Sequence, residues 1–235
     1  MKIGIIGAMD VEVRMLKDMM QDAVVTRISG IEYYAGTISN VPVVVAQAGI
    51  GKVNAAVCTE AMILKYEPTA IINIGVAGGL SAKLKVGDIA VADNVCEHDM
   101  DTTVFGDPLG FITGINKVNI PCDEWVSGTL LSAAEKIEGI NTICGTIVSG
   151  DQFISSKEKK AQLIENFGAV ATEMEGAAIG HVCCMNEVPF GVLRAISDSA
   201  DDEADMSFNE FCQMAAKNSV AVILSFLETV KEKNI

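Results

Sequence analysis

The sequence lacks the clustered positive charge and the long apolar runs that mark several classes of protein. Its 235 residues include 17 Lys and Arg against 31 Asp and Glu, a formal net charge of −14, and no basic run is longer than Lys159-Lys160. Nucleic acids and anionic membranes are bound by clustered Lys and Arg, so we expect neither as a partner. No apolar run reaches the ~18 residues that a membrane span needs.

Histidine is scarce, and paired cysteine motifs are absent. The two histidines are His98 and His181, and the seven cysteines contain no Cys-x-x-Cys. Neither pattern has the spacing of a metal-ligand set, so we expect no metal site. An odd number of scattered cysteines is typical of reduced, mostly buried thiols, which predicts a cytoplasmic protein.

What the chain does contain is enough apolar sequence for a substantial core. Hydrophobic residues make up 50% of the chain and charged residues 20%, which is typical of a globular protein rather than a disordered one. The sequence shows no linker, low-complexity tract or internal repeat. We therefore expect residues 1–235 to form a single domain.

Short apolar runs alternate with helical patterns along the chain. The predicted strands cover residues 2–6, 41–46, 70–74, 88–92, 142–148, 169–172 and 190–196. The predicted helices cover residues 11–21, 52–65, 127–135, 157–166, 173–185 and 207–232. This alternation predicts an α/β fold with three layers.

Two local features add detail to this plan. Ser207 and Glu210 have the spacing of a capping box, which predicts that the last helix begins at Ser207. Residues 106–123 are expected to be irregular, and a loop of that length is more often a lid or binding segment than a passive connection.

Carboxylates stand near the ends of two predicted strands. Glu173 and Glu175 flank Met174 just after one strand, and Asp198 follows another. A carboxylate beside a buried strand is costly unless it is paired, and open α/β sheets bind ligands at such strand ends. The pattern indicates chemistry on a polar small molecule.

Two further charged residues need an explanation. Glu12 lies in the first turn of a predicted helix, where an acid compensates the helix dipole, but the same position suits a general base at a strand end. The sequence alone leaves both interpretations open. Arg194 lies inside a predicted apolar strand, so its cation needs a partner or a ligand.

Two glycine-rich segments follow predicted strands. Residues 75–79 do not have the Gly-x-Gly-x-x-Gly spacing and have no acid where a nicotinamide ribose would need one, and residues 49–52 do not form a Walker loop. Each segment is either a tight strand-to-helix turn or a place where the backbone approaches a ligand closely. No cofactor is implied.

With these residues identified, the chain resembles the 5′-methylthioadenosine/S-adenosylhomocysteine nucleosidase family over nearly its whole length. The shared motifs are Gly4-Ile5-Ile6-Gly7-Ala8-Met9 with Glu12, Ala48-Gly49-Ile50-Gly51-Lys52-Val53, Ile72-Asn73-Ile74-Gly75 with Ala77-Gly78-Gly79-Leu80, Val86-Gly87-Asp88-Ile89, His98-Asp99 with Phe105-Gly106, Ser149-Gly150-Asp151-Gln152-Phe153-Ile154, Glu173-Met174-Glu175, and Arg194-Ala195-Ile196-Ser197-Asp198. Together these motifs are highly specific. The resemblance implies a nucleoside phosphorylase/hydrolase-like fold, with a central mixed sheet flanked by helices.

The activity that the resemblance implies is hydrolysis of the bond between adenine and ribose in methylthioadenosine, S-adenosylhomocysteine and 5′-deoxyadenosine. Such a cleavage passes through an oxocarbenium-like sugar, so the leaving adenine needs a proton and the attacking water needs a base. By resemblance, Asp198 protonates N7 with Ser197 beside it. Glu12 activates the water, and Arg194 helps to hold the site. Glu175 accepts hydrogen bonds from the ribose hydroxyls.

The resemblance also implies how the rest of the substrate is held. Adenine lies by Gly78 and against Phe153, and the backbone of Ile154 pairs with its edge, which rejects 6-oxopurines. Met174 packs on the sugar. The pocket for the 5′-alkylthio group is formed by Met9, Ile50, Phe208 and, from a second subunit, Phe105. A homodimer is therefore implied.

The sequence departs from the family pattern in three places. Val76 stands where many members have Ser near the water site, and Thr102 occupies a position that is often Val. Residues 106–123 match poorly. How the water is held and how large a 5′ substituent is tolerated therefore stay open.

Three other functions compete with this interpretation. A phosphorylase of the same fold needs cations for phosphate, whereas Asp10 and Glu12 follow the first strand and Arg14, the nearest cation, is expected to face away. A hydrolase of a futalosine-type nucleoside differs only beyond the 5′ carbon. A non-catalytic nucleoside-binding protein is expected to lack one of the carboxylates at 12, 175 and 198, and all three are present.

Overall fold

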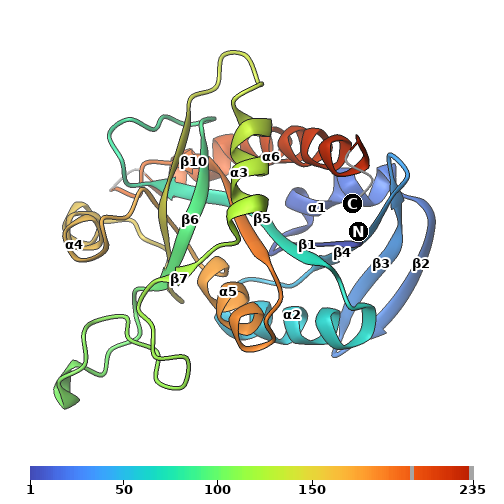
Figure 1. Ribbon diagram of the computed structural model, residues 1–235. Helices are drawn as coiled ribbons and strands as arrows, with labels where there is room; N and C mark the ends of the chain where they lie inside the picture. The colour runs from blue at the N-terminus through green and yellow to red at the C-terminus, as the bar shows by residue number, and fades with distance from the viewer. Residues whose placement is uncertain (202–203, 233–235) are drawn as a thin grey trace.

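A ten-stranded mixed sheet runs through the molecule (Figure 1). The computed structural model describes residues 1–201 and 204–232. The strands are β1 (Ile3–Gly7), β2 (Gln21–Ile28), β3 (Ile31–Ile38), β4 (Val41–Gln47), β5 (Ala70–Gly79), β6 (Ile89–Glu97), β7 (Ile120–Pro121), β8 (Thr142–Ser149), β9 (Ala171–Glu173) and β10 (Phe190–Asp198). The helices are α1 (Asp10–Met19), α2 (Lys52–Tyr66), α3 (Glu124–Ala134), α4 (Lys157–Phe167), α5 (Gly176–Met185) and α6 (Ala204–Glu232), with a short 3-10 helix η1 (Thr103–Phe105).

The sheet contains parallel and antiparallel pairs, as the resemblance implies. Its order is β10-β6-β8-β9-β5-β1-β4-β3-β2, and β7 pairs with β6. Strands β1, β4, β5 and β10 run parallel, whereas β6 is antiparallel to β10. Because β5 pairs with both β9 and β10, the strands β10, β6, β8, β9 and β5 close on themselves. This closure brings residues of β5, β9 and β10 into contact.

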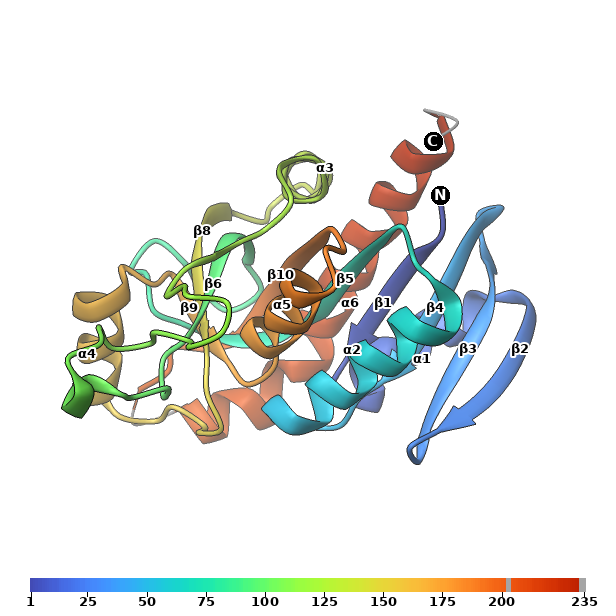
Figure 2. The same cartoon turned by 60° about the horizontal axis from the view of Figure 1, so that its bottom comes forward.

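Helices cover both faces of the sheet, which confirms the three-layer prediction. Helices α1, α3 and α6 lie on one face, and α2 and α5 lie on the other (Figure 1 and Figure 2). Alternate residues of β1 point to the two sides: Ile3 and Ile5 join one apolar cluster, and Ile6 joins the other. Within the described ranges, no helix has both the length and the apolar content to cross a lipid bilayer.

Most predicted elements differ from the structure only by a residue or two at their ends, but two strands are longer. The predicted strand 70–74 continues as β5 to Gly79, so residues 75–79 are strand and not a strand-to-helix turn. The predicted strand 88–92 continues as β6 to Glu97. The turn at residues 49–52 is confirmed, with positive φ at Gly49 and Gly51.

Three helix starts were placed wrongly by local patterns. Helix α3 begins at Glu124 rather than at 127, because the side chain of Asp123 caps it. The last helix begins at Ala204, whose amide donates to the Asp201 carbonyl at 2.9 Å. The capping-box prediction at Ser207 is therefore wrong. The helix predicted from residue 173 begins at Gly176 instead.

The hairpin of β2 and β3 is absent from the predicted elements. Its turn contains Ser29 and Gly30, with φ values of 52° and 82°. Most of β2 is exposed, and polar residues flank its apolar run of Ala23-Val24-Val25, which leaves only a weak strand signal. Residues 106–123 are largely irregular, as predicted, apart from β7 and a single bridge between Ile112 and Lys117.

Candidate active site

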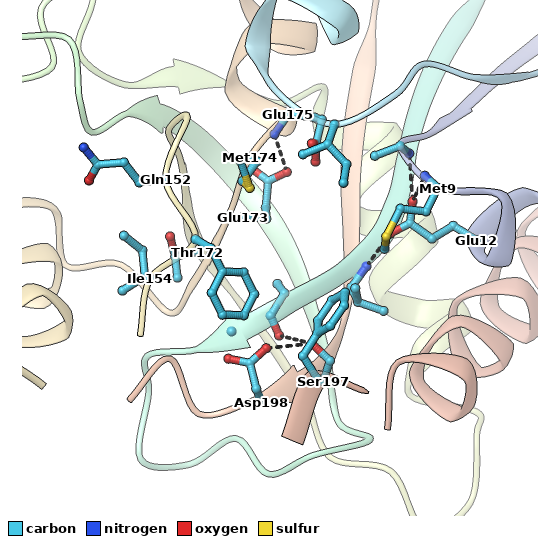
Figure 3. A pocket seen from close by; sticks show the side chains of 17 residues that line it. Met9, Glu12, Gln152, Ile154, Thr172, Glu173, Met174, Glu175, Ser197 and Asp198 are labelled. Atoms are coloured by element: carbon cyan, nitrogen blue, oxygen red, sulfur yellow. Dashed lines mark hydrogen bonds between the residues drawn. The ribbon is translucent and has the colours of Figure 1, made fainter. Parts of the chain in front are cut away.

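A cavity of about 290 Å³ opens where several strands of the sheet end (Figure 3). Open α/β sheets bind ligands at such strand ends. The wall comes from β5, β9 and β10, from segments that follow β1, β4 and β8, and from α6. The lining residues are Ala8, Met9, Glu12, Ile50, Val76, Ala77, Gly78, Gln152, Phe153, Ile154, Thr172, Glu173, Met174, Glu175, Ser197, Asp198 and Phe208.

This cavity brings together all the predicted site residues except two. Arg194 is 1% exposed and lies behind the wall, because its guanidinium is held there by polar partners. Phe105 lies in η1, is 84% exposed and does not line the cavity. The resemblance places Phe105 in the cavity of a second subunit, so its contribution stays a prediction.

Glu12 is a buried carboxylate in the first turn of α1. Its Oε2 accepts hydrogen bonds from the amides of Ala8 at 2.7 Å and Met9 at 2.9 Å, and its Oε1 accepts from the amide of Val76 at 3.1 Å. Burial raises the pKa of Glu12, while Arg194 and these amides oppose the rise. By accepting a hydrogen bond from the Met9 amide, Glu12 stabilises the start of α1, as expected of an acid at that position. Because Glu12 also lines the cavity, the same carboxylate can accept a proton there.

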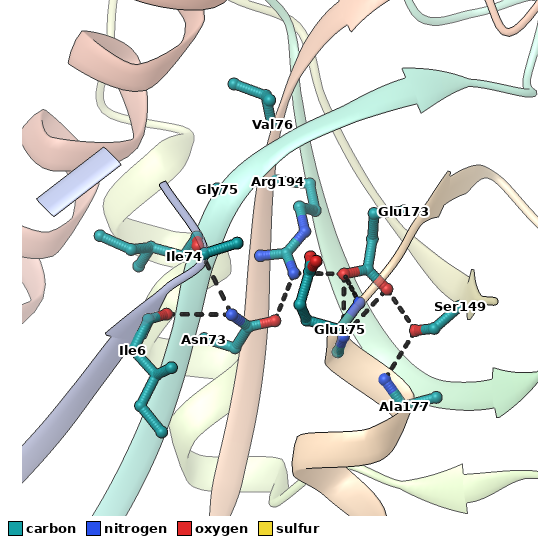
Figure 4. A network of polar contacts seen from close by, with 12 residues as sticks. Ile6, Asn73, Ile74, Gly75, Val76, Ser149, Glu173, Glu175, Ala177 and Arg194 are labelled. Atoms are coloured by element: carbon teal, nitrogen blue, oxygen red, sulfur yellow. Dashed lines mark hydrogen bonds and ion pairs between the residues drawn. The ribbon is translucent and has the colours of Figure 1, made fainter. Parts of the chain in front are cut away.

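Arg194 carries its charge inside β10 and finds polar partners there (Figure 4). Its Nη2 donates to the side-chain oxygen of Asn73 and to the Glu173 carboxylate, and its Nη1 donates to the Leu193 carbonyl at 3.0 Å. The expectation that this cation needs a partner is confirmed. Arg194 does not line the cavity, but its charge opposes the rise in the pKa of Glu12 and of Glu175.

Glu173 is a residue to which the sequence assigned no role. Its carboxylate accepts hydrogen bonds from the amides of Glu175 at 2.9 Å and Gly176 at 2.8 Å, and from the Ser149 hydroxyl (Figure 4). Burial opposes its ionisation, but Arg194 and the hydrogen bonds outweigh burial and lower the pKa of Glu173. Glu173 thus fixes the start of α5. The available signal was an acid at the end of a predicted apolar strand, where a buried carboxylate needs partners.

Glu175, the residue directly before α5, lines the cavity. Its Oε1 accepts a hydrogen bond from the amide of Gly51 at 2.8 Å. Burial and the neighbouring charge of Glu173 raise the pKa of Glu175 to about 8, against the opposing effect of Arg194. The turn before α2 therefore holds this carboxyl group through a backbone amide.

The raised pKa of Glu175 predicts a variant that gains stability. The folded protein holds this proton up to about pH 8, whereas the unfolded chain loses it near the ordinary pKa of 4.5, so ionisation in the unfolded chain lowers the stability of the fold as pH rises between those values. We expect Glu175→Gln to raise the free energy of unfolding by roughly 1–3 kcal/mol near pH 8 and to change it little near pH 4. Urea unfolding at both pH values measures this. Glu165→Gln, at an exposed position of α4, is the control, and equal stability of parent and Glu175→Gln near pH 8 would contradict the raised pKa.

Asp198 ends β10 and is held at both of its oxygens. Oδ1 accepts from the Ala200 amide and Oδ2 from the Ser197 hydroxyl, each at 2.8 Å. Burial raises the pKa of Asp198 although both hydrogen bonds lower it, and a raised pKa suits a carboxyl group that donates a proton. A Cβ on Gly78 would stand 2.8 Å from Oδ1, so this close approach requires glycine.

Aromatic and apolar side chains form the rest of the wall. The rings of Phe153 and Phe208 meet edge to face, with centroids 5.7 Å apart. Ile154 is buried, whereas Phe153 is 47% and Ile50 55% exposed. This part of the cavity is open to solvent in the single chain.

The histidines lie outside the cavity. His181 places Nδ1 3.0 Å from a carboxylate oxygen of Glu97, and His98 is buried. Over residues 1–201 and 204–232, no three or more His, Cys, Asp or Glu side chains are grouped so as to hold a metal ion.

The arrangement can perform acid and base chemistry on one bound molecule. Glu12, at the start of α1, and Asp198, at the end of β10, lie in different parts of the wall (Figure 3). Glu175 lies in a third part, between β9 and α5. Burial raises the pKa of Glu12 and of Asp198 alike, and a carboxyl group whose pKa is raised can donate a proton when protonated and accept one when ionised. Such a site suits cleavage of a bond that needs both.

Comparison with known proteins identifies the family. The family model described as the phosphorylase superfamily matches residues 2–228, and the chain belongs to that superfamily. A curated relative is the 5′-methylthioadenosine/S-adenosylhomocysteine nucleosidase of Exiguobacterium sp. It is 39% identical over 233 residues, which cover 99% of this chain and 100% of the relative.

Solved structures agree with this assignment. The Neisseria meningitidis 5′-methylthioadenosine/S-adenosylhomocysteine nucleosidase in complex with methylthio-immucillin-A is 38% identical, with a TM-score of 0.94 over 97% of this chain and 99% of that one. The futalosine hydrolase of Helicobacter pylori is also 38% identical, with a TM-score of 0.92 over 97% of both chains.

Proposed function

We propose that this protein hydrolyses the N-glycosidic bond of 5′-methylthioadenosine and S-adenosylhomocysteine, and of 5′-deoxyadenosine, and releases adenine and the 5′-substituted ribose. The observation that carries the proposal is the meeting of Glu12, Glu175 and Asp198 in one cavity. The Exiguobacterium relative and the neisserial complex support the substrate class. The reaction would recycle by-products of S-adenosylmethionine and serve methionine salvage.

Asp198 and Glu12 act on opposite sides of the sugar. Asp198 donates its proton to N7 as the bond between C1′ and N9 breaks, and the bonding electrons leave with a neutral adenine. Water adds to C1′ from the other face, and Glu12 takes the proton that this water loses. Asp198 ends ionised and Glu12 protonated, so solvent exchange restores the starting state.

The remaining wall residues hold the substrate in this proposal. Adenine packs against Phe153 beside Gly78, and the backbone of the buried Ile154 pairs with its edge. Glu175 accepts hydrogen bonds from the ribose hydroxyls, and Met174 packs on the ring. Met9, Ile50 and Phe208 take the 5′-alkylthio group.

The segment that follows β1 favours water over phosphate as the attacking group. Arg14 pairs with Asp10 and its side chain is 68% exposed, which confirms that it faces away. Arg194 is engaged by Glu173, and no Lys or Arg is among the described lining residues. An anion would meet carboxylates there without a cation to bind it.

Adenine release is therefore expected to be independent of phosphate. Purified protein is incubated with methylthioadenosine, with and without phosphate, and free adenine is measured. We expect equal rates in both reactions. A rate that requires phosphate would identify a phosphorylase, and nucleoside binding without adenine release would identify a non-catalytic binding protein.

A futalosine-type substrate is the second candidate. The 38% identity and TM-score of 0.92 to the Helicobacter pylori futalosine hydrolase favour it. Such a substrate with an adenine base differs from methylthioadenosine only beyond the 5′ carbon, so the same carboxylates would act on it. A panel of adenine nucleosides with different 5′ groups, ranked by kcat/KM, decides between the two.

We also infer a homodimer in which Phe105 completes the partner's cavity. Val104 and Phe105 are each 84% exposed, and the wall at Ile50 is open to solvent in the single chain. Two further apolar residues are exposed: Leu64 on α2 is 71% exposed, and Met185 on α5 is 67% exposed. Exposed apolar groups of this kind are typical of association surfaces.

A cytoplasmic location is also part of the proposal. All seven cysteines are free thiols in the structure, and Cys58, Cys96, Cys122 and Cys183 are buried. Unpaired thiols are typical of a reducing compartment.

A further inference from the structure

Lys160, on α4, joins two strand ends beside the cavity. Its Nζ donates to the Gly79 carbonyl at 2.9 Å and to the Ser199 carbonyl at 2.6 Å. Gly79 ends β5 next to Gly78, and Ser199 directly follows Asp198. One ammonium group thus ties together the two segments on which Gly78 and Asp198 face each other.

The turn that Lys160 holds is not a relaxed one. Ala200 has a φ of 51°, in the left-handed region that residues with a side chain rarely adopt. In this conformation its amide donates to Oδ1 of Asp198 at 2.8 Å. Such a backbone persists only where surrounding contacts hold it. Lys160 supplies one of these contacts from a separate helix.

The fit between this turn and β5 is also tight. A Cβ at Gly78 would stand 2.8 Å from both the Ala200 Cβ and the Asp198 carboxylate. A small movement of the turn would therefore displace the carboxyl group relative to Gly78, where the proposed function places adenine. Catalytic groups lose much of their effect when they are displaced by as little as ~1 Å.

We infer that Lys160 is a positioning residue for Asp198, a role that rests on the proposed function. It ties the 198–200 turn to β5 and sets the orientation of the proton donor. Lys160 does not line the cavity, so it acts through Asp198 and not on the substrate.

The charge of Lys160 gives this role a measurable signature. Burial is the largest influence on the pKa of Asp198 and raises it; of the charged groups around it, Asp201 in the following loop raises it and Lys160 on α4 lowers it. Removal of the ammonium charge is therefore expected to raise the pKa of Asp198 further. A residue that only packed the helix would not shift a titration.

The test compares Lys160→Met with Lys160→Arg and with Lys159→Met. For Lys160→Met we expect kcat for adenine release to fall about tenfold. We also expect the alkaline limb of the pH profile of kcat/KM, which reports loss of the Asp198 proton, to move up by about half a pH unit. Lys160→Arg keeps the charge and the donors, so its rate is expected to stay within about threefold of the parent with an unmoved profile. Lys159→Met removes the same charge one residue away, on a side chain whose charge bears on His98, and we expect parental values.

Thermal unfolding and binding of a nucleoside analogue establish that each variant is folded. The inference is overturned if Lys160→Met keeps the parental rate and profile. It is also overturned if Lys160→Met and Lys160→Arg lose rate equally with unmoved limbs, since only packing would then be involved. An inactive parent protein would instead overturn the proposed function, which separates the two failures.

Discussion

Asp198→Asn is expected to lower kcat for adenine release by about 10²–10⁴-fold while nucleoside binding changes little. Asparagine keeps the shape of the side chain. Its oxygen can still accept the hydrogen bond that the Ala200 amide donates to Asp198 at 2.8 Å. Its amide group cannot deliver a proton to N7, so adenine would have to leave as an anion. Single-turnover release of adenine measures the rate, and equilibrium titration with nucleoside measures binding.

A substrate that needs no leaving-group proton sharpens this test. A 5-methylthioriboside of 4-nitrophenol releases a stable phenolate, so Asp198→Asn is expected to hydrolyse it at close to the parental rate. Asp18→Asn, at an exposed position of α1, makes the same chemical change away from the cavity. Adenine release by Asp198→Asn within tenfold of the parental rate would exclude Asp198 as the acid.

The place of the cavity could be predicted because charged groups at buried strands need partners. Glu12, Glu175 and Asp198 were each identified as acids next to apolar runs, and the structure places all of them on one cavity. The same reasoning predicted that Arg194 has a partner. Its identity, Glu173, could not be predicted, because it depends on β5 pairing with both β9 and β10.

Other differences arise where tertiary contacts override local pattern. Residues 75–79 look like a turn because they are rich in glycine, yet they extend β5, and Gly78 is required there because the Asp198 carboxylate packs against it. Strand β2 is exposed on both sides over most of its length, so its sequence does not need to be apolar and gives little signal. The role of Phe105 depends on a second chain, which no pattern within one sequence can position.

The proton-accepting side of the reaction rests on a different group, so its variant is expected to behave differently. We expect Glu12→Gln to lower kcat by about 10²–10⁴-fold on methylthioadenosine and equally on the nitrophenyl riboside, because both need an activated water. The glutamine oxygen can still accept hydrogen bonds from the amides of Ala8 and Met9. Its NH₂ group would face the Val76 amide, which donates a hydrogen bond to Glu12 at 3.1 Å, so two donors would meet there.

One unpaired amide costs about 1–3 kcal/mol, so unfolding measurements are needed to show that Glu12→Gln remains folded, with Glu135→Gln at an exposed site as the control. Two carboxylates that share one role would give variants with the same substrate dependence. If Asp198→Asn alone retains activity on the nitrophenyl riboside, the two groups act on different bonds. Rapid hydrolysis of that riboside by Glu12→Gln would remove Glu12 from the activation of water and leave Glu175 as the carboxylate to test in that role.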